Sequence, residues 1–281
     1  MLDESEKAKK MLEALEERLK NGDVSIEEYE QLKAKYQARL SQTDVEEESF
    51  DKEKPKKAIP RMISISGSGQ VTEDYISISG SGSVEGWGNG SIKISGSGKI
   101  SDDKISVSGS AKLSGDVKTE TIKSSGALKV EGDVQAGVMK CSGSTKVEGD
   151  LTIEEEAKFS GAVKVEGDLQ VKDGDLAVSG AAKLDGNVTA KDASFDGAFR
   201  ITGDVSAVNF EAEMGDKCKI GGVLRATDVN IRQDRRRAYL KIKEIQATGQ
   251  VYLEGVSADL VTGKTVELGP DCEIKEVREE S

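Results

Sequence analysis

Apolar and polar residues alternate with a period of two in a nine-residue phrase that recurs along most of this chain. The first copy is Ile63-Ser-Ile-Ser-Gly-Ser-Gly-Gln-Val71. Such alternation indicates a strand with one buried face, and recurrence at a short period indicates a repeat fold. Eight further copies cover residues 76–84, 92–100, 105–113, 122–130, 139–147, 157–165, 176–184 and 193–201.

Each phrase is centred on a glycine, and from the fourth phrase onward a second glycine follows six residues later. In the regular part, from Gly109 to Gly197, the central glycines recur every 17 to 19 residues. Glycine accepts backbone conformations that other residues avoid, so it suits the corners of a coil. Short strands that meet at such corners, with like residues recurring once per turn, predict a parallel β-helix of roughly 12 coils of about 17 residues. A propeller or sandwich would need longer units and more aromatic residues.

The domain limits follow from the same pattern. We expect the β-helix over residues 62–276 and a charged tail at 277–281. The first three glycine spacings are 13, 16 and 13 residues, so the first coils are less regular. We expect loops that leave the coil at 86–90 and at 233–237. Residues 41–61 carry charge runs, Pro55 and Pro60, which are typical of a flexible linker.

Residues 1–40 predict a pair of short amphipathic helices. The first ends at Asn21-Gly22, and Ser25 with Glu28 forms a capping box for the second. Two helices of this size bury little on their own, so we expect the hairpin to oligomerise; a monomeric appendage is the alternative. The apolar stripes contain Leu12, Leu15 and Leu19 in the first helix and Tyr29, Leu32 and Tyr36 in the second.

The composition argues against catalysis. The 281-residue chain has no histidine, which removes the usual general base and metal ligand near neutral pH. Its net charge of −12 argues against a general nucleic-acid binder. The three cysteines show no CxxC spacing and no apolar run has the length of a membrane span, so we expect a cytoplasmic protein without a zinc site or disulfide framework. We therefore expect no catalytic residue, no metal and no cofactor.

Rows of charge are expected on the outside of the coils. Cations stand three residues after the central glycines and acids two residues further on, which suits either a solvated face or an electrostatic docking face for a partner or second filament. Short acids follow the second glycines, beginning with Asp116, and such acids usually cap their own turns. A calcium ladder is the alternative, but the glycine–aspartate signature of calcium-binding β-helices is missing. The cations are Lys99, Lys112, Lys129, Lys146, Lys164, Lys183 and Arg200, and the acids are Glu131, Glu148, Glu166 and Asp185.

Three places are candidates for contact with other molecules. Trp87 lies in a glycine-rich loop, where it either contacts a partner or folds back over the first coil. The cluster Arg235-Arg236-Arg237 is either an anion-binding or membrane-surface contact or a solvated loop. The ends of the β-helix matter most, because an uncapped coil exposes backbone hydrogen-bonding groups and an apolar cross-section. The expected polymerisation interface comprises Ile63, Ile65 and Val71 in the N-terminal coil and Cys272, Ile274 and Val277 in the C-terminal coil.

Two segments resemble known families. The run Ile105-Ser-Val-Ser-Gly-Ser-Ala-Lys-Leu-Ser-Gly-Asp-Val117 and its echo Val147-Glu-Gly-Asp-Leu151 resemble the bactofilins, polymer-forming cytoskeletal proteins, and the resemblance extends over about residues 62–276. It implies a right-handed parallel β-helix that polymerises end to end without nucleotide. The segment 15–33 resembles the SHOCT helical hairpin, which implies an additional oligomerisation or recruitment module.

The working hypothesis is a non-enzymatic, self-assembling scaffold of the cytoplasm or of the inner face of the cell membrane. Its expected partners are copies of itself and other filament or envelope-associated proteins, with no nucleic acid. The alternative is a monomeric or small-oligomer adaptor that binds a protein partner through the charged faces of the β-helix. A polysaccharide-cleaving enzyme with an acidic groove is disfavoured, because we expect neither the signal peptide nor the aromatic-lined cleft of a secreted hydrolase.

Overall fold

The computed structural model describes residues 62–71, 75–87, 90–101 and 103–279. The chain divides into two compact units, Met1–Lys57 and Ala58–Ser281, and every described residue belongs to the second. The predicted helical hairpin at 1–40 and linker at 41–61 lie outside the described residues.

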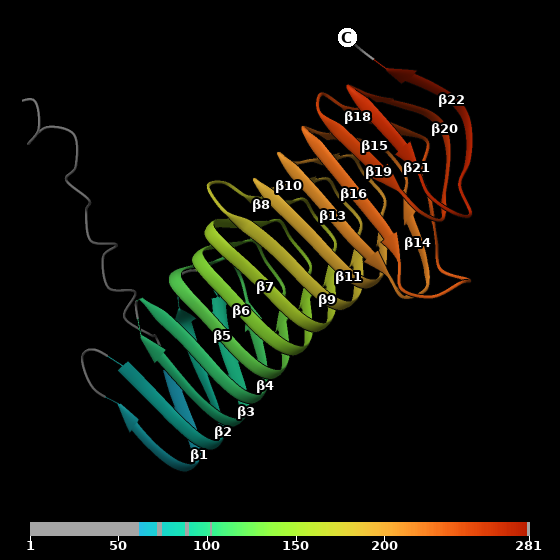
Figure 1. Cartoon of the computed structure of the whole chain (residues 1–281). Coiled ribbons are helices and arrows are strands. Elements are labelled where there is room, and N and C mark those ends of the chain that lie inside the picture. Colours follow the sequence, from blue (N-terminus) through green and yellow to red (C-terminus); the bar gives the residue numbers. More distant parts are fainter. Residues whose placement is uncertain (1–61, 72–74, 88–89, 102, 280–281) are drawn as a thin grey trace, which may run out of the picture. The chain divides into compact units, whose positions relative to one another are not determined.

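The regular elements of the described part are all β-strands, which follow one another around a common core (Figure 1). The first four are β1 (Met62–Val71), β2 (Tyr75–Trp87), β3 (Gly90–Ser101) and β4 (Lys104–Ser114). The regular turns continue with β5 (Val117–Val130), β6 (Val134–Val147), β7 (Leu151–Val165), β8 (Leu169–Val171), β9 (Asp175–Leu184), β10 (Val188–Thr189), β11 (Asp192–Ile201) and β12 (Val205–Ser206). The remaining strands are β13 (Asn209–Met214), β14 (Lys217–Ile220), β15 (Val223–Ala226), β16 (Asp228–Gln233), β17 (Tyr239–Lys241), β18 (Glu244–Ala247), β19 (Gln250–Leu253), β20 (Val256–Gly263), β21 (Thr265–Leu268) and β22 (Glu273–Glu279).

From β4 onward the strands form a parallel β-solenoid, as predicted. Strands β4, β5, β6, β7, β9, β11, β13, β16, β19 and β21 pair in parallel, each with the next, and so define about ten turns. Like positions stack into internal ladders. One ladder is Ile105, Ile122, Met139, Ala157, Leu176, Ala193, Phe210, Val229, Val251 and Val266. Another is Val117, Val134, Leu151, Leu169, Val188, Val205, Leu224, Ile245, Val261 and Val277.

The prediction of parallel coils is wrong for the first four strands. β1 pairs with β2, β2 with β3 and β3 with β4 in antiparallel register. The short spacings of 13 and 16 residues therefore reflect hairpin connections rather than irregular coils. This is why the turns number about ten rather than twelve.

The symmetry of the phrase explains why both directions are accepted. In β3, Ile92 and Ile100 stand four residues before and four after Gly96. Reversing the strand therefore keeps glycine opposite glycine and apolar opposite apolar: Gly96 faces Gly109, Ile92 faces Leu113 and Ile100 faces Ile105. Since side chains alternate across a strand, both directions bury the same face.

Three smaller expectations concern the two predicted loops and the C-terminal tail. Trp87 and Gly90, two residues of the predicted loop at 86–90, stay in the sheet, because they end β2 and begin β3 and pair with each other, with a register irregularity between Glu85 and Trp87. The loop predicted near 233–237 does connect β16 to β17. The predicted tail at 277–281 begins as strand, since β22 continues to Glu279.

Candidate assembly surfaces

The N-terminal edge of the solenoid is β1, the strand that carries the first phrase. Within the described residues β1 pairs only with β2, so its other edge has no strand partner there. The predicted interface positions Ile63, Ile65 and Val71 lie opposite Val84, Gly82 and Ile76 respectively. An edge strand with unpaired backbone groups is a template for pairing with another chain.

The C-terminal edge exposes the ends of the internal ladders. β21 pairs with β19 and β22 with β20, and no described strand covers either. Val277 stacks on Val261 and keeps 41% of its surface exposed, whereas Val261 keeps 0%. Leu268 stacks on Leu253 and keeps 44% exposed, against 0% for Leu253. The apolar cross-section of the last turn therefore lies open.

The predicted C-terminal residues are partly the right ones. Ile274 stacks on Ala258 and is half-buried, like Val277 an inward position of the last turn. Cys272 is half-buried and its Sγ donates to the carbonyl of Leu253 at 3.2 Å, while burial raises the pKa of its thiol. Sequence reasoning missed Leu268, although the alternation Thr265-Val-Glu-Leu268 was the signal that could have found it.

The side of the solenoid carries the predicted row of cations, except that one predicted lysine is replaced by another. Because β3 is antiparallel, Lys93 rather than Lys99 lies opposite Lys112, and Lys99 lies opposite Ser106. The row then continues in parallel register through Lys129, Lys146, Lys164, Lys183, Arg200, Lys219 and Lys241.

In the middle turns each cation of this row pairs with the neighbouring acids. Lys129 Nζ lies 2.7 Å from Glu131 and 3.1 Å from Glu148, so one lysine bridges two turns. Lys146 bridges Glu148 and Glu166 in the same way. Hydrogen bonds from Lys112 and Lys129 lower the pKa of Glu131 to about 2. These lateral pairs offset the repulsion between stacked like charges and leave the middle turns internally matched.

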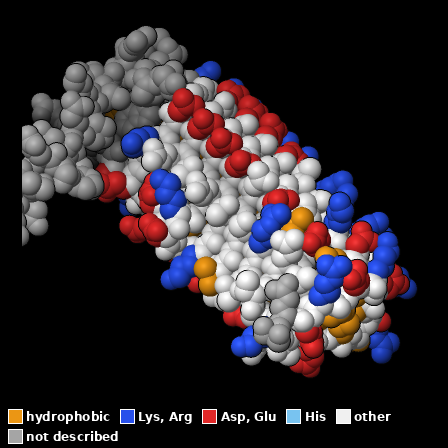
Figure 2. Space-filling view, turned by 90° about the horizontal axis from the view of Figure 1, so that it is seen from above, with side chains coloured by type: hydrophobic (Ala, Val, Ile, Leu, Met, Phe, Trp, Pro, Cys, Tyr) orange, Lys and Arg blue, Asp and Glu red, His pale blue; other side chains and the backbone are white. Residues whose placement is uncertain are grey.

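The corner aspartates cap the next turn rather than their own. Oδ1 of Asp116 accepts the backbone N–H of Asp133 at 3.0 Å, and Oδ1 of Asp133 accepts that of Asp150 at 2.8 Å. The contact continues through Asp168, Asn187 and Asp204. Figure 2 shows a line of acidic side chains along the solenoid. Within the described residues, no group of three or more carboxylates or thiols is placed to hold a metal ion.

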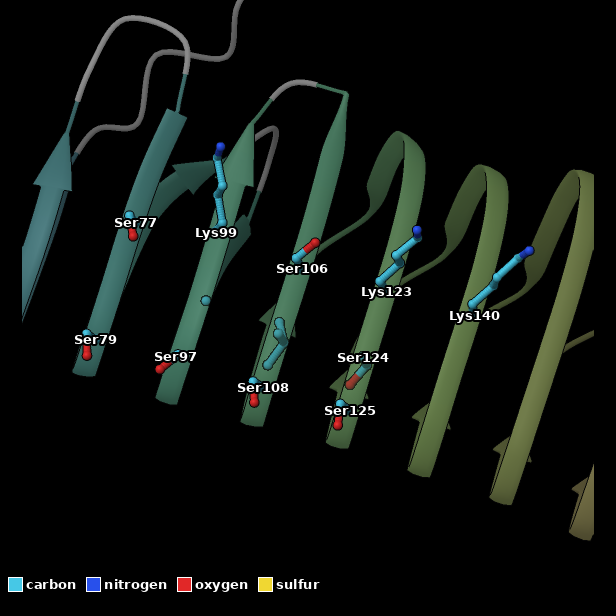
Figure 3. A pocket seen from close by; sticks show the side chains of 12 residues that line it. Ser77, Ser79, Ser97, Lys99, Ser106, Ser108, Lys123, Ser124, Ser125 and Lys140 are labelled. Atoms are coloured by element: carbon cyan, nitrogen blue, oxygen red, sulfur yellow. The ribbon is translucent and has the colours of Figure 1, made fainter.

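A shallow hollow lies over the antiparallel strands and the turns that follow. It measures about 620 Å³ and is lined by hydroxyls and by amines such as Lys99, Lys123 and Lys140 (Figure 3). Burial raises the pKa of the Cys141 and Cys218 thiols to about 11, so neither is a thiolate near neutral pH.

The remaining sequence candidates are the arginine cluster and Trp87. Arg235, Arg236 and Arg237 are exposed in the connection between β16 and β17, and Arg235 pairs with Asp234 at 3.5 Å. Trp87 ends β2 at the N-terminal hairpins. No helix among the described residues has the length and apolar character needed to cross a membrane.

Comparison with known proteins gives a family match for part of the chain. Residues 141–237 match the Bactofilin family, described as polymer-forming cytoskeletal. The chain carries a bactofilin domain. The matched bactofilin region runs from within β6 to the connection after β16, which are regular parallel turns, and the antiparallel strands β1–β4 lie before it. No curated protein and no solved structure matches the chain.

Proposed function

We propose that this chain is a non-enzymatic cytoskeletal scaffold whose solenoids polymerise end to end without a nucleotide. The observation that carries the proposal is the open C-terminal cross-section, where Leu268 and Val277 end two apolar ladders. The bactofilin domain supports it, since that family is described as polymer-forming.

The energetics favour a continued stack. Fully burying a Val or Leu side chain contributes about 1.5–3 kcal/mol, so covering the exposed two-fifths of Val277 and Leu268 contributes roughly 1 kcal/mol each. Strand pairing along β21 and β22 adds backbone hydrogen bonds between copies, although the N–H of Val266 already donates to Oε1 of Glu279 at 3.1 Å. These gains must exceed an association cost of about 4–15 kcal/mol, so we expect polymers only above a threshold concentration.

The N-terminal edge has the pattern needed to accept a second strand. β1 already pairs with β2 through the same phrase, with Gly67 opposite Gly80 and Ile63 opposite Val84. A second copy of β1 presents the same sequence of apolar residues and glycines in the same antiparallel register. Both ends therefore offer strand edges, and assembly needs no bound cofactor to create them.

Further parts of the proposal rest on the sequence. The hairpin at residues 1–40 serves as an additional oligomerisation or recruitment module. The scaffold works in the cytoplasm, where its partners are copies of itself and other filament or envelope-associated proteins. Removing residues 1–57 tests the hairpin: filaments persist, and only higher-order association or recruitment is lost.

The end contact is tested by sedimentation velocity of Val277→Lys against Glu276→Lys. Both variants place a lysine in β22, but position 277 stacks on the Val261 ladder, whereas position 276 pairs with Leu260 on the exposed side of the strand. We expect Val277→Lys to raise the polymerisation threshold by about fivefold or more, since it removes the roughly 1 kcal/mol assigned to Val277 and each 1.4 kcal/mol is a factor of ten. Equal sedimentation of the two variants would show that the last turn is not the junction.

A further inference from the structure

We propose that the later turns of the solenoid, which contain β11, β14 and β17, also bind sideways to a second copy of the chain, through two complementary rows of charge. The first row, here the basic face, consists of Arg200, Lys219 and Lys241. The second row, here the aspartate corner, consists of Asp133, Asp150 and Asp168. The contact uses the sides of the solenoid and so is separate from the ends that form the polymer.

The basic face has an excess of positive charge because the position two residues after each of its cations is not an acid. In the middle turns, the position two residues after each cation is an acid, the last being Asp185, which pairs with Lys183 at 3.3 Å. After Arg200, Lys219 and Lys241 that position is Thr202, Gly221 and Lys243. All three cations are exposed, and none forms an ion pair with a described residue.

The surroundings of the basic face add positive charge. Lys217 and Lys243 are exposed next to it on the same turns. Lys219, Lys241, Lys243 and Lys275 line a hollow of about 610 Å³ together with Asp259 and Glu273. Lys275 pairs with Asp259 at 2.6 Å, and the nearby Lys241 and Lys243 act on the same carboxylate, lowering its pKa further. The basic face therefore keeps a positive excess that no described residue removes.

The aspartate corner is acidic and held in place. Oδ1 of Asp133, Asp150 and Asp168 accepts the backbone N–H of the next turn at 2.7 to 2.8 Å, which fixes each carboxylate. None of the three forms an ion pair with a described cation. The adjoining outward positions in the same turns are the uncharged Gln135, Thr152 and Gln170.

The two rows match because they share one repeat. Successive members of each row come from successive turns, whose strands lie about 4.8 Å apart. Three cations thus meet three carboxylates without adjustment of either backbone. In this pairing Arg200 of one copy meets Asp133 of the other. Asp133 follows Lys129 on the same turn, and Arg200 lies four turns after Lys129 in one column. Parallel neighbours therefore lie staggered by about 19 Å, four strand spacings.

The symmetry of this contact determines what it builds. Different surfaces of the two copies meet, so each copy keeps one free basic face or one free aspartate corner for a further neighbour. Repeated, the contact lays solenoids side by side in an open row. With a net charge of −12, two copies repel unless a local excess of the opposite sign is present, which is what the basic face supplies.

The test compares two triple variants in an Ile65→Lys, Val277→Lys background, in which both proposed end contacts are disrupted. One variant reverses the basic face (Arg200→Glu, Lys219→Glu, Lys241→Glu). The other neutralises the corner (Asp133→Asn, Asp150→Asn, Asp168→Asn). Asparagine keeps the accepting oxygen, as Asn187 does in the same row at 2.9 Å from the Asp204 nitrogen. The matched control reverses three cations on another side of the solenoid (Lys123→Glu, Lys140→Glu, Lys158→Glu).

Sedimentation velocity at low salt should show association of the Ile65→Lys, Val277→Lys parent that disappears near 1 M salt, where the screening length is about 3 Å. Both triple variants should raise the dissociation constant by about tenfold or more, with unchanged circular dichroism, while the control should not. The proposal is overturned if the parent stays monomeric at low salt, if either triple variant associates like the parent, or if the control loses association equally. Anionic vesicles bound by the basic face of a monomeric parent would assign that face to a lipid surface instead. Electron microscopy of the triple variants with native ends separates the sideways contact from end-to-end polymerisation. Single, unassociated filaments would show that the end contact is intact and that only the sideways contact is lost.

Discussion

The glycine corner offers a test of the fold in which one methyl group is added to the backbone. Gly180 has a φ of 118°, and a Cβ there would lie 2.5 Å from the carbonyl oxygen of Gly161 in the turn below. Holding a non-glycine residue at such a φ costs about 1–3 kcal/mol. The overlap adds to this, because the carbonyl belongs to the stacked backbone and cannot move freely. We therefore expect Gly180→Ala to destabilise the solenoid by about 3 kcal/mol.

That loss corresponds to a fall in Tm of about 6–12 °C for a unit of this size, at about 2–4 °C per kcal/mol. The assay is thermal and urea unfolding followed by circular dichroism, in the Ile65→Lys, Val277→Lys background, where both proposed end contacts are disrupted, so that polymerisation does not add stability. Gly215→Ala is the matched control, because Gly215 donates its N–H to the carbonyl of Gly197 but has no positive φ, and a Cβ there would lie 3.5 Å from its nearest atom, Cα of Gly197. Equal Tm values for the two variants would refute the reasoning about the corner.

Three further predictions concern the interior and the charged row. Ser124→Ala should leave the Tm unchanged or raise it, because the Ser124 hydroxyl is buried without a hydrogen-bond partner, a state that costs about 1–3 kcal/mol; a clear fall in Tm would contradict this. Phe195→Ala should lower unfolding free energy by about 3–5 kcal/mol in urea titrations, since its buried ring packs 5.0 Å from Phe199 and 5.9 Å from Phe210, measured between ring centroids. The pKa of Glu131 is lowered to about 2, so its ion pairs stabilise the folded chain fully at pH values above the ordinary carboxyl pKa near 4.3. This stabilisation is lost as the pH falls toward 2. Urea midpoints between pH 6 and 2 should therefore fall more steeply for the native chain than for Glu131→Gln, and parallel curves would argue against the ion-pair row.

The solenoid was predictable from the sequence because its determinants are local and repeated. Alternation in each phrase identified the buried face, and the glycine spacing identified the turn. The ladder through Ile122, Met139 and Ala157 has the register that this spacing predicts. The match over residues 141–237 falls on these regular turns.

The direction of the first strands was not predictable from the same signals. A phrase with apolar residues four positions before and after its glycine buries the same face in either direction, so periodicity alone cannot distinguish the two. The first three phrases differ from the later ones by a second glycine two residues after the first, at Gly69, Gly82 and Gly98. Combined with the short spacings, these glycines were the available signal for hairpins.

The charged surface was predictable in composition but not in pairing. The row of cations and the row of acids could be read from the repeat, but their bridging across turns depends on the register and on side-chain reach. Lys99 was placed in the wrong column because β3 runs in reverse. The end of the acidic row after Asp185, which leaves Arg200 without a partner of this kind, is visible in the sequence once the columns are known.

The central claim, assembly through the ends of the solenoid, is tested most directly by electron microscopy of the purified chain without nucleotide. The native chain and Ser68→Lys, a change at an exposed position of β1, should form filaments. Ile65→Lys in the same strand should abolish them while the circular dichroism stays unchanged. Position 65 is an apolar position of the phrase through which β1 pairs with β2, and we propose that a second copy of β1 pairs through the same phrase. Discrete small particles of the native chain at every salt concentration, or filaments of Ile65→Lys equal to those of Ser68→Lys, would contradict assembly through this edge.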